Sequence, residues 1–193
     1  MTVVTLTSVA DAFYENENPN TNYGTSESMF TGENYGNNRR HELVVKFDLS
    51  AIQNNAMIVS SAQLKLYDYD DLQQVTARCR PYRLTAAFTE GTVTWNTKPA
   101  YDTTSLGYTD IANDYRGDVT IDLPTSLIQQ WGRGTLDNYG FIVRNTHTDR
   151  EFEENAVDDV MVAFFAREYS DSTKRPRLVI TYKVPAAKSA FFM

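Results

Sequence analysis

The chain has 193 residues, of which 41% are hydrophobic and 12% aromatic, and its formal net charge is −7. That length and apolar content suffice for the core of one domain, whereas the negative charge would repel DNA or RNA, so no nucleic-acid partner is expected. No stretch approaches the roughly 18 consecutive apolar residues of a membrane span, and the first residues lack the basic and apolar regions of a signal peptide, so neither is predicted.

Segments that alternate apolar and polar residues recur along the chain, with turns rich in Asn, Gly, Asp and Pro between them. This period of two places one set of side chains on a core face and the other toward solvent, which is typical of half-buried strands. A Pro-Thr-Ser start followed by apolar residues predicts a short helix over 125–130. In chain order the predicted strands are 43–49, 62–67, 119–123, 139–143, 160–165 and 177–182.

Two predicted loops are long, 15–40 and 146–159, and the second carries six acidic residues. Strands in this number, without repeats, predict an all-β, jelly-roll-like antiparallel β-sandwich with one short helix and long loops, as a single domain over 1–182. Residues 183–193 follow the last strand as a tail. Its apolar end predicts an arm that binds a neighbouring subunit, with a frayed terminus as the alternative. The residues of this arm are Phe191, Phe192 and Met193.

Side chains suited to catalysis are sparse. His41 and His147 lie far apart without metal-ligand spacing, and neither a Gly-x-Ser-x-Gly elbow nor a His-Glu-x-x-His motif occurs. The lone Cys79 cannot form an intramolecular disulfide and is interpreted as a half-buried structural residue. Neighbouring acids such as Asp70 and Asp71 are interpreted as solvated loop charges. An enzyme is therefore not predicted.

Acidic and Asn-rich loops can supply several oxygen ligands for a hard cation. Asp11, Glu15 and Asp149 are the candidate ligands of a structural calcium, although no EF-hand pattern supports them, and no other cofactor is expected. Further along, Arg167 and Glu168 are adjacent in what reads as a strand. Their side chains would then point to opposite faces and could not form a simple ion pair.

Tyrosines in or near loops combine an aromatic face with a hydroxyl group, which suits either sugars or protein partners. Trp95 and Trp131 lie in blocks flanked by strands and are interpreted as structural anchors rather than as sugar platforms. The predicted glycan- or partner-binding residues are Tyr14, Tyr23, Tyr35, Tyr101, Tyr108 and Tyr115.

Short blocks follow one another in a definite order along nearly the whole chain. They are ADAFY at 10–14, NPNTNYG at 18–24, FDLS at 47–50, SAQLKLY at 61–67, FTEGTVTWNTKP at 88–99, LIQQW at 127–131, NYGFIV at 138–143, FAREY at 165–169 and RPRLVITY at 175–182. In this order they resemble the modules called DNRLRE domains, which are grouped with carbohydrate-binding module family 96 and described as similar to the growth-factor propeptide sandwich.

The resemblance implies a non-catalytic module that works on an exposed surface. The first hypothesis is a structural protein of a bacterial virus, as a decoration, fibre-associated or tail-associated subunit of the virion. It would contact other structural subunits, including copies of itself, on the virion surface or outside the cell, and lysis would release it without a signal peptide. The alternative is a glycan-binding module on a cell or extracellular surface. A polysaccharide-cleaving enzyme is the least supported hypothesis.

Overall fold

The computed structural model describes residues 1–34, 39–70, 72, 75–147 and 160–185, and within them the chain is mainly β. The strands are β1 (Thr2–Glu15), β2 (Ser28–Asn34), β3 (Arg39–Phe47), β4 (Ile58–Asp70), β5 (Ala77–Leu84), β6 (Tyr101–Ser105), β7 (Thr109–Ile111), β8 (Gly117–Asp122), β9 (Phe141–His147), β10 (Val162–Phe165) and β11 (Arg177–Lys183). The helices are α1 (Thr125–Arg133) and the single 3-10 turns η1 (Ser50–Ile52), η2 (Trp95–Thr97) and η3 (Ser172–Lys174). The predicted all-β sandwich with one short helix is confirmed.

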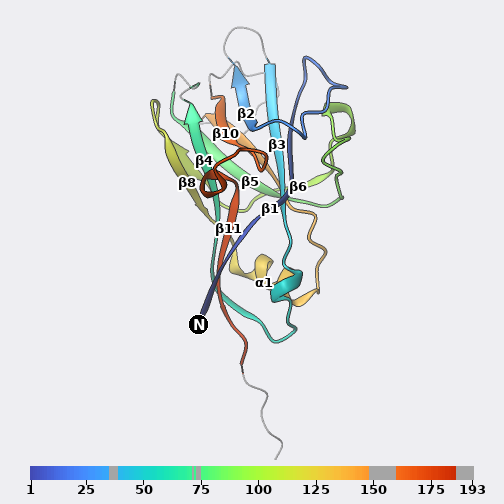
Figure 1. Ribbon diagram of the computed structural model, residues 1–193, viewed down its shortest axis with the longest axis vertical. Helices are drawn as coiled ribbons and strands as arrows, with labels where there is room; N and C mark the ends of the chain where they lie inside the picture. The colour runs from blue at the N-terminus through green and yellow to red at the C-terminus, as the bar shows by residue number, and fades with distance from the viewer. Residues whose placement is uncertain (35–38, 71, 73–74, 148–159, 186–193) are drawn as a thin grey trace, which may run out of the picture.

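Strand β1 closes the sheet on itself by changing partners halfway along its length. Residues 2–7 pair antiparallel with β11, and the strand then pairs antiparallel with β3 from Ser8 to Glu15, with a register shift between Ser8 and Ala10. The remaining neighbours follow the order β1-β11-β4-β10-β2-β3-β9-β5-β6, with β8 added to β4 and β7 added to β5. The two layers of the sandwich are therefore joined into a barrel-like closed sheet (Figure 1).

The main core lies between the two layers. Phe47, Phe141 and Phe164, from three different strands, are fully buried there. In β4, Leu64 is fully buried whereas the next residue, Lys65, stays partly exposed, which is the predicted period of two. Burying one large apolar side chain contributes about 1.5–3 kcal/mol, so this alternating set is the main source of stability.

A second, smaller core covers the outer face of the layer formed by β1, β3, β9 and β5. Tyr14, Val44 and Ile142 point away from the main core, and the segment between β5 and β6 places Val93 and Trp95 over them. This part of the sheet is buried on both faces, so the last five residues of β1 are all buried and show no alternation. The polar residues Asp11 and Glu15 are buried among these five, so this half of β1 lacks both the alternation and the apolar run by which the other strands were predicted.

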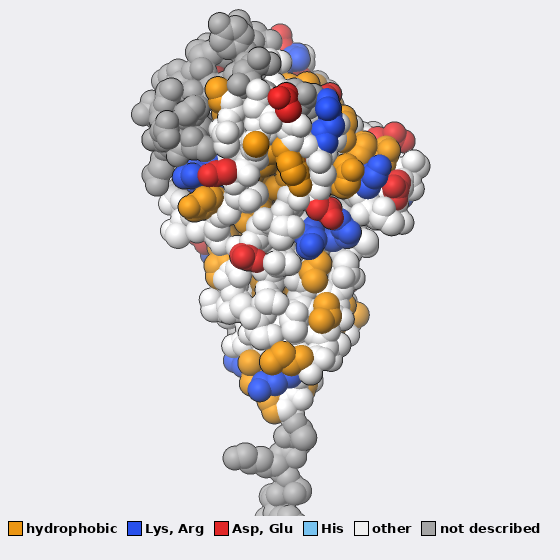
Figure 2. Space-filling view, turned by 90° about the vertical axis from the view of Figure 1, so that its left-hand side faces the viewer, with side chains coloured by type: hydrophobic (Ala, Val, Ile, Leu, Met, Phe, Trp, Pro, Cys, Tyr) orange, Lys and Arg blue, Asp and Glu red, His pale blue; other side chains and the backbone are white. Residues whose placement is uncertain are grey.

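Helix α1 closes the narrow end of a molecule that tapers strongly from top to bottom (Figures 1 and 2). The helix begins after Pro124 and ends at Gly134, whose φ of +68° gives the left-handed cap that favours glycine. Trp131 is 3% exposed, so its predicted role as a structural anchor is confirmed. Among the described residues, no helix has the length and apolar character that crossing a membrane would require.

In the turn that leads into β9, adding a single methyl group is expected to destabilise the fold strongly. Gly140 has φ +96°, and a Cβ there would lie 2.3 Å from the backbone oxygen of Val45. We expect Gly140→Ala to lower the free energy of unfolding by at least about 2 kcal/mol, measured by urea denaturation. Gly91→Ala is the matched control, because a Cβ at Gly91 has nothing within 4 Å. Equal stability of the two variants would contradict this account of the turn.

Candidate functional site

A cavity of about 330 Å³ opens at the wide end of the sandwich, where β1, β2 and β3 meet. Aromatic rings form one wall of this wide-end pocket. Tyr23 stacks on Phe13 with ring centroids 4.3 Å apart, and Phe30 meets Phe13 edge-on at 5.1 Å. Such offset and edge-on contacts are favoured by the ring quadrupoles, so the wall is rigid and apolar.

Polar side chains on the pocket's other side converge on Glu15, which is 4% exposed. The Tyr23 hydroxyl and the Asn18 amide each donate to Glu15 Oε1 at 2.6 Å. Glu15 Oε2 lies 2.9 Å from Arg39 Nε and 3.2 Å from His41 Nε2. Both carboxylate oxygens are thereby engaged, and the pocket contains a guanidinium, an imidazole and amide groups around one acid.

The charges in this pocket are set by its hydrogen bonds and by burial. Burial alone would raise the pKa of Glu15, but the hydrogen bonds from Tyr23 and Asn18 and the charge of Arg39 outweigh it, so this pKa lies below its usual value. Burial lowers the pKa of His41 in spite of the nearby Glu15. At neutral pH the pocket therefore holds an ionised carboxylate and a neutral imidazole.

The turn that carries Tyr23 is fastened to the segment between β5 and β6. Asn22 donates from Nδ2 to the backbone oxygens of Glu90 and Val93, each at 2.7 Å, and its Oδ1 accepts from the Gly24 N–H at 3.2 Å. A Cβ on Gly24 would lie 2.1 Å from the Glu90 oxygen, so only glycine fits. The Asn-Tyr-Gly sequence thus places the Tyr23 ring in the pocket without depending on the ring itself.

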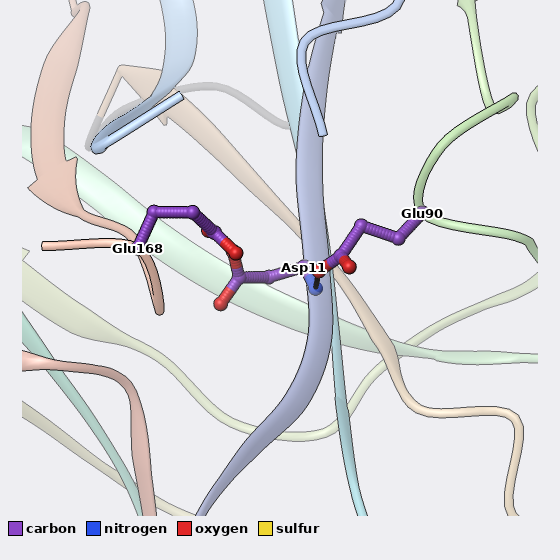
Figure 3. A group of neighbouring side chains, drawn as sticks. All are labelled: Asp11, Glu90 and Glu168. Atoms are coloured by element: carbon purple, nitrogen blue, oxygen red, sulfur yellow. Dashed lines mark hydrogen bonds between the residues drawn. The ribbon is translucent and has the colours of Figure 1, made fainter. Parts of the chain in front are cut away.

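Three carboxylates meet beside the middle of β1. Asp11 of β1 lies between Glu90, from the segment before η2, and Glu168, from the turn after β10 (Figure 3). One carboxylate oxygen of each residue lies within 4.8 Å of the others. Asp11 is 1% exposed, and its Oδ2 accepts from the Ser8 hydroxyl at 2.9 Å and from the Arg167 N–H at 3.1 Å. This carboxylate cluster is therefore held by hydrogen bonds from two parts of the chain.

Positive charge in this cluster comes from Arg167, whose Nη1 lies 2.7 Å from Glu90 and 3.1 Å from Glu168. Burial raises the pKa of Asp11 to about 7, and the charges of Glu168 and Glu90 add to the rise, against the hydrogen bonds from Ser8 and Arg167. Oε2 of Glu168 is buried and has no hydrogen-bond partner. Carboxylate oxygens are the ligands that Ca²⁺ prefers, so these three acids could hold a hard cation.

The family model described as carbohydrate-binding module family 96 matches residues 2–182. The chain belongs to this family. A search of curated proteins finds no match. The matched range of the family 96 module includes the wide-end pocket and the carboxylate cluster.

The structure separates the residues that the sequence proposed for calcium. Asp11 lies in the carboxylate cluster of the family 96 module, but Glu15 lies four residues further along the same strand, about 13 Å away at the usual rise per residue, and serves the wide-end pocket. Asp149 lies outside the described residues. Sequence reasoning did not identify Glu90 and Glu168 as partners of Asp11. The one signal that could have pointed to them was their place in the FTEG and FAREY blocks.

Of the six predicted tyrosines, Tyr23 alone among those described lines the wide-end pocket. Tyr14, predicted as a binding residue near a loop, instead lies in β1 and is 0% exposed beneath the segment between β5 and β6, so its ring is not available to a ligand. Tyr101 is half-buried and its hydroxyl accepts from Arg144 at 2.7 Å. Tyr108 and Tyr115 are exposed on other parts of the surface. Tyr35 and the arm residues Phe191, Phe192 and Met193 lie outside the described residues.

Proposed function

We propose that this family 96 module binds a glycan in the wide-end pocket. The observation that supports the proposal most is the combination of an aromatic wall with an ionised carboxylate, a guanidinium and an amide in one cavity. Sugar rings present an apolar face and a rim of hydroxyl groups, which such a mixture matches. A volume of about 330 Å³ is near the small end of ligand pockets, so it suits one terminal or branching sugar unit.

We propose further that the bound sugar is not chemically changed. Glycoside hydrolysis generally uses two carboxyl groups on either side of the bond, one of them protonated. Glu15 is the one acidic side chain that lines the pocket within the described part of the chain, and its lowered pKa keeps it ionised. Carbohydrate-binding modules are typically non-catalytic, which agrees with this proposal.

For the biological setting we propose a virion surface of a bacterial virus, where the chain would be a decoration, fibre-associated or tail-associated subunit of the DNRLRE type. The start of β1 and the end of β11 pair at the narrow end, opposite the pocket (Figure 1). A subunit attached there would leave the pocket free to contact a host glycan. Mass spectrometry of purified particles tests this setting, and finding the chain only in cell-envelope fractions would favour the alternative of a cell-surface module.

Structural calcium stays a prediction, now located at the carboxylate cluster rather than at the set of acids proposed from the sequence. The three acids belong to segments that are far apart in the chain, so a cation there would tie β1 to the turns that carry Glu90 and Glu168. The turn that carries Glu168 is already held by Tyr169, whose ring stacks on that of Phe165 with centroids 3.5 Å apart.

An array of immobilised glycans tests glycan binding, followed by NMR titration of the full chain with each glycan that binds. We expect the aromatic signals of Tyr23, Phe30 and His41 to shift, because these rings line the wide-end pocket. Tyr108 and Tyr115 serve as internal controls and should not shift. Shifts confined to the two control tyrosines would place the site elsewhere, and an array without binding at any glycan would contradict the proposed function.

A further inference from the structure

A second cavity lies further along β3, the strand that runs from the wide end toward α1 (Figure 1). Its volume is about 510 Å³, larger than that of the wide-end pocket and within the range of ligand sites. His41 of β3 lines the first cavity and Phe47 the second, and these residues are about 20 Å apart at the usual rise per residue. No described residue lines both cavities, so this β3–α1 pocket is a separate site. Side chains that line it include Val9, Lys46, Asp48, Gln53, Trp131 and Leu136.

Hydrogen bonds from side chains to the backbone hold the walls of the β3–α1 pocket together. Asn138, in the loop between α1 and β9, donates from Nδ2 to the backbone oxygen of Phe47 at 2.8 Å, and its Oδ1 accepts from the Gly140 N–H at 3.0 Å. Asp48 accepts from the N–H and the hydroxyl of Ser50 at 2.8 and 2.9 Å. These bonds join the end of β3 to η1 and to the loop before β9, so the shape of the cavity does not depend on a ligand.

Part of the lining is apolar and contains one buried donor. Trp131 is 3% exposed, Leu136 is half-buried and Val9 is 47% exposed. The indole N–H of Trp131 is buried and has no hydrogen-bond partner among the described residues. An unpaired buried donor lowers the stability of a fold, and in native structures such a group calls for an explanation. A ligand oxygen that entered the cavity would give this donor a partner.

The polar part of the lining carries charges of both signs. Lys46 and Asp48 lie at the end of β3, and Asp137 lies in the loop before β9. The hydrogen bonds from Ser50 and the charge of Lys46 hold the pKa of Asp48 below its usual value, so this acid is ionised at neutral pH. Within the described part of the chain, the Lys46 ammonium and the Gln53 amide make no hydrogen bond, so both can donate to a ligand.

We propose that the β3–α1 pocket is a second, weaker sugar site that binds units of an uncharged polysaccharide. Sugar hydroxyl groups both donate and accept, so one ring can bond to the ammonium, the amide and the carboxylates of this lining. An anionic sugar would meet two acids and one cation, in a chain whose net charge is −7, so an uncharged sugar is favoured.

The scarcity of exposed aromatic rings makes this site the weaker of the two. Its aromatic lining residues among those described are Phe47 and Trp131, and both are too deeply buried to present a ring face as Tyr23 does. We expect sugars to bind here at least about 30-fold more weakly than in the wide-end pocket. The inference rests on the proposed function for its class of ligand, but each pocket can bind without the other.

NMR titration of the full-length Tyr23→Ala variant with linear hexasaccharides of glucose, mannose and xylose tests the proposal, because this variant lacks the stronger site. The chain has two tryptophans and therefore two indole N–H signals. The Trp131 signal is expected to shift, since an accepted hydrogen bond deshields the proton, whereas Trp95 lines neither pocket and should not shift. A hexasaccharide of uronic acid is expected to bind at least about tenfold more weakly.

Lys46→Ala, added to the Tyr23→Ala chain, tests the polar lining. This variant is expected to weaken the binding seen at Trp131 at least about tenfold with an unchanged Tm, because the side chain is partly exposed and its ammonium holds no other described residue by a hydrogen bond. Lys65→Ala is the matched control, since Lys65 is also a partly exposed strand residue but lines neither pocket. Equal affinities of the two variants would contradict the proposal.

The wild-type chain distinguishes this proposal from the proposed function. Signals of Tyr23 and Phe30 report on the wide-end pocket, and the Trp131 indole reports on the β3–α1 pocket. Shifts at Tyr23 with an unmoved Trp131 signal, up to the highest sugar concentration, would overturn the second site and leave the proposed function standing. A shift at Trp131 alone would support the second site and contradict the wide-end pocket. Tighter binding of the uronic acid chain would overturn the preference for an uncharged sugar.

Discussion

Replacing Tyr23 by alanine should remove most glycan binding while leaving the fold intact. Its ring forms the pocket wall with Phe13, and its hydroxyl donates to Glu15 at 2.6 Å. The turn around it is held by Asn22 and Gly24, so it should keep its shape without the ring. We expect the affinity for a glycan identified on the array to fall about 30-fold or more, measured by calorimetry.

Two further variants make this result specific. Tyr23→Phe keeps the ring but removes the hydrogen bond to Glu15, so we expect an intermediate affinity and a Glu15 pKa closer to its usual value. Tyr115→Ala is the matched control, because this exposed tyrosine lies outside the pocket and donates to the backbone oxygen of Asp118. Retained affinity in Tyr23→Ala, or lost affinity in Tyr115→Ala, would contradict the assignment of the wide-end pocket.

Alternation is clearest in the strands with one buried face, whereas β3, β9 and β10 were predicted from their apolar runs although consecutive residues in them are buried. In β4, Leu64 and Leu66 face the core while Lys65 between them is partly exposed, so the pattern is visible in the sequence. Strand β1 fails the same criterion for two reasons. Its first half is mostly exposed, and its last five residues are buried on both faces because the segment between β5 and β6 covers them. Only tertiary packing creates that second buried face, so a local pattern could not predict it.

The contrast between local pattern and tertiary packing also explains which residues of the site were predicted from the sequence and which were missed. Tyr23 is in a loop, as the sequence indicated, and the loop folds back on β1. The expectation that Arg167 and Glu168 cannot pair is wrong, because both lie in a turn after β10 rather than in a strand, and they form an ion pair at 3.1 Å. Contacts between Asp11 and acids far along the chain depend on topology, which spacing in one sequence does not reveal.

Acidification is expected to stabilise the carboxylate cluster, and Asp11→Asn isolates this effect. Asp11 has a pKa of about 7 when folded and about 3.8 when unfolded, so the folded protein binds more protons between these values. The stability from this group is fully present below pH 3.8 and is lost as pH rises through 7. The difference corresponds to an upper limit on the order of 4 kcal/mol.

Asp11→Asn keeps an oxygen to accept from Ser8 and Arg167 and has no charge to bury beside Glu90 and Glu168. Urea denaturation in EDTA is therefore expected to show the variant more stable than the wild type at pH 8, by about 2 kcal/mol, with the advantage lost near pH 4. Glu15 and His41, whose lowered pKa values make acid destabilising, are common to both proteins and cancel in the difference.

Adding Ca²⁺ at pH 8 separates the two ways of relieving the cluster's negative charge. A cation needs ionised Asp11, so Ca²⁺ is expected to raise the Tm of the wild type and leave Asp11→Asn unchanged. Equal Tm responses of the two proteins to Ca²⁺ would contradict calcium binding at this cluster, but would not bear on the predicted effect of protonating Asp11. A wild type whose stability relative to Asp11→Asn does not fall between pH 4 and 7 would show instead that Asp11 is ionised throughout, because Arg167 outweighs the two neighbouring acids.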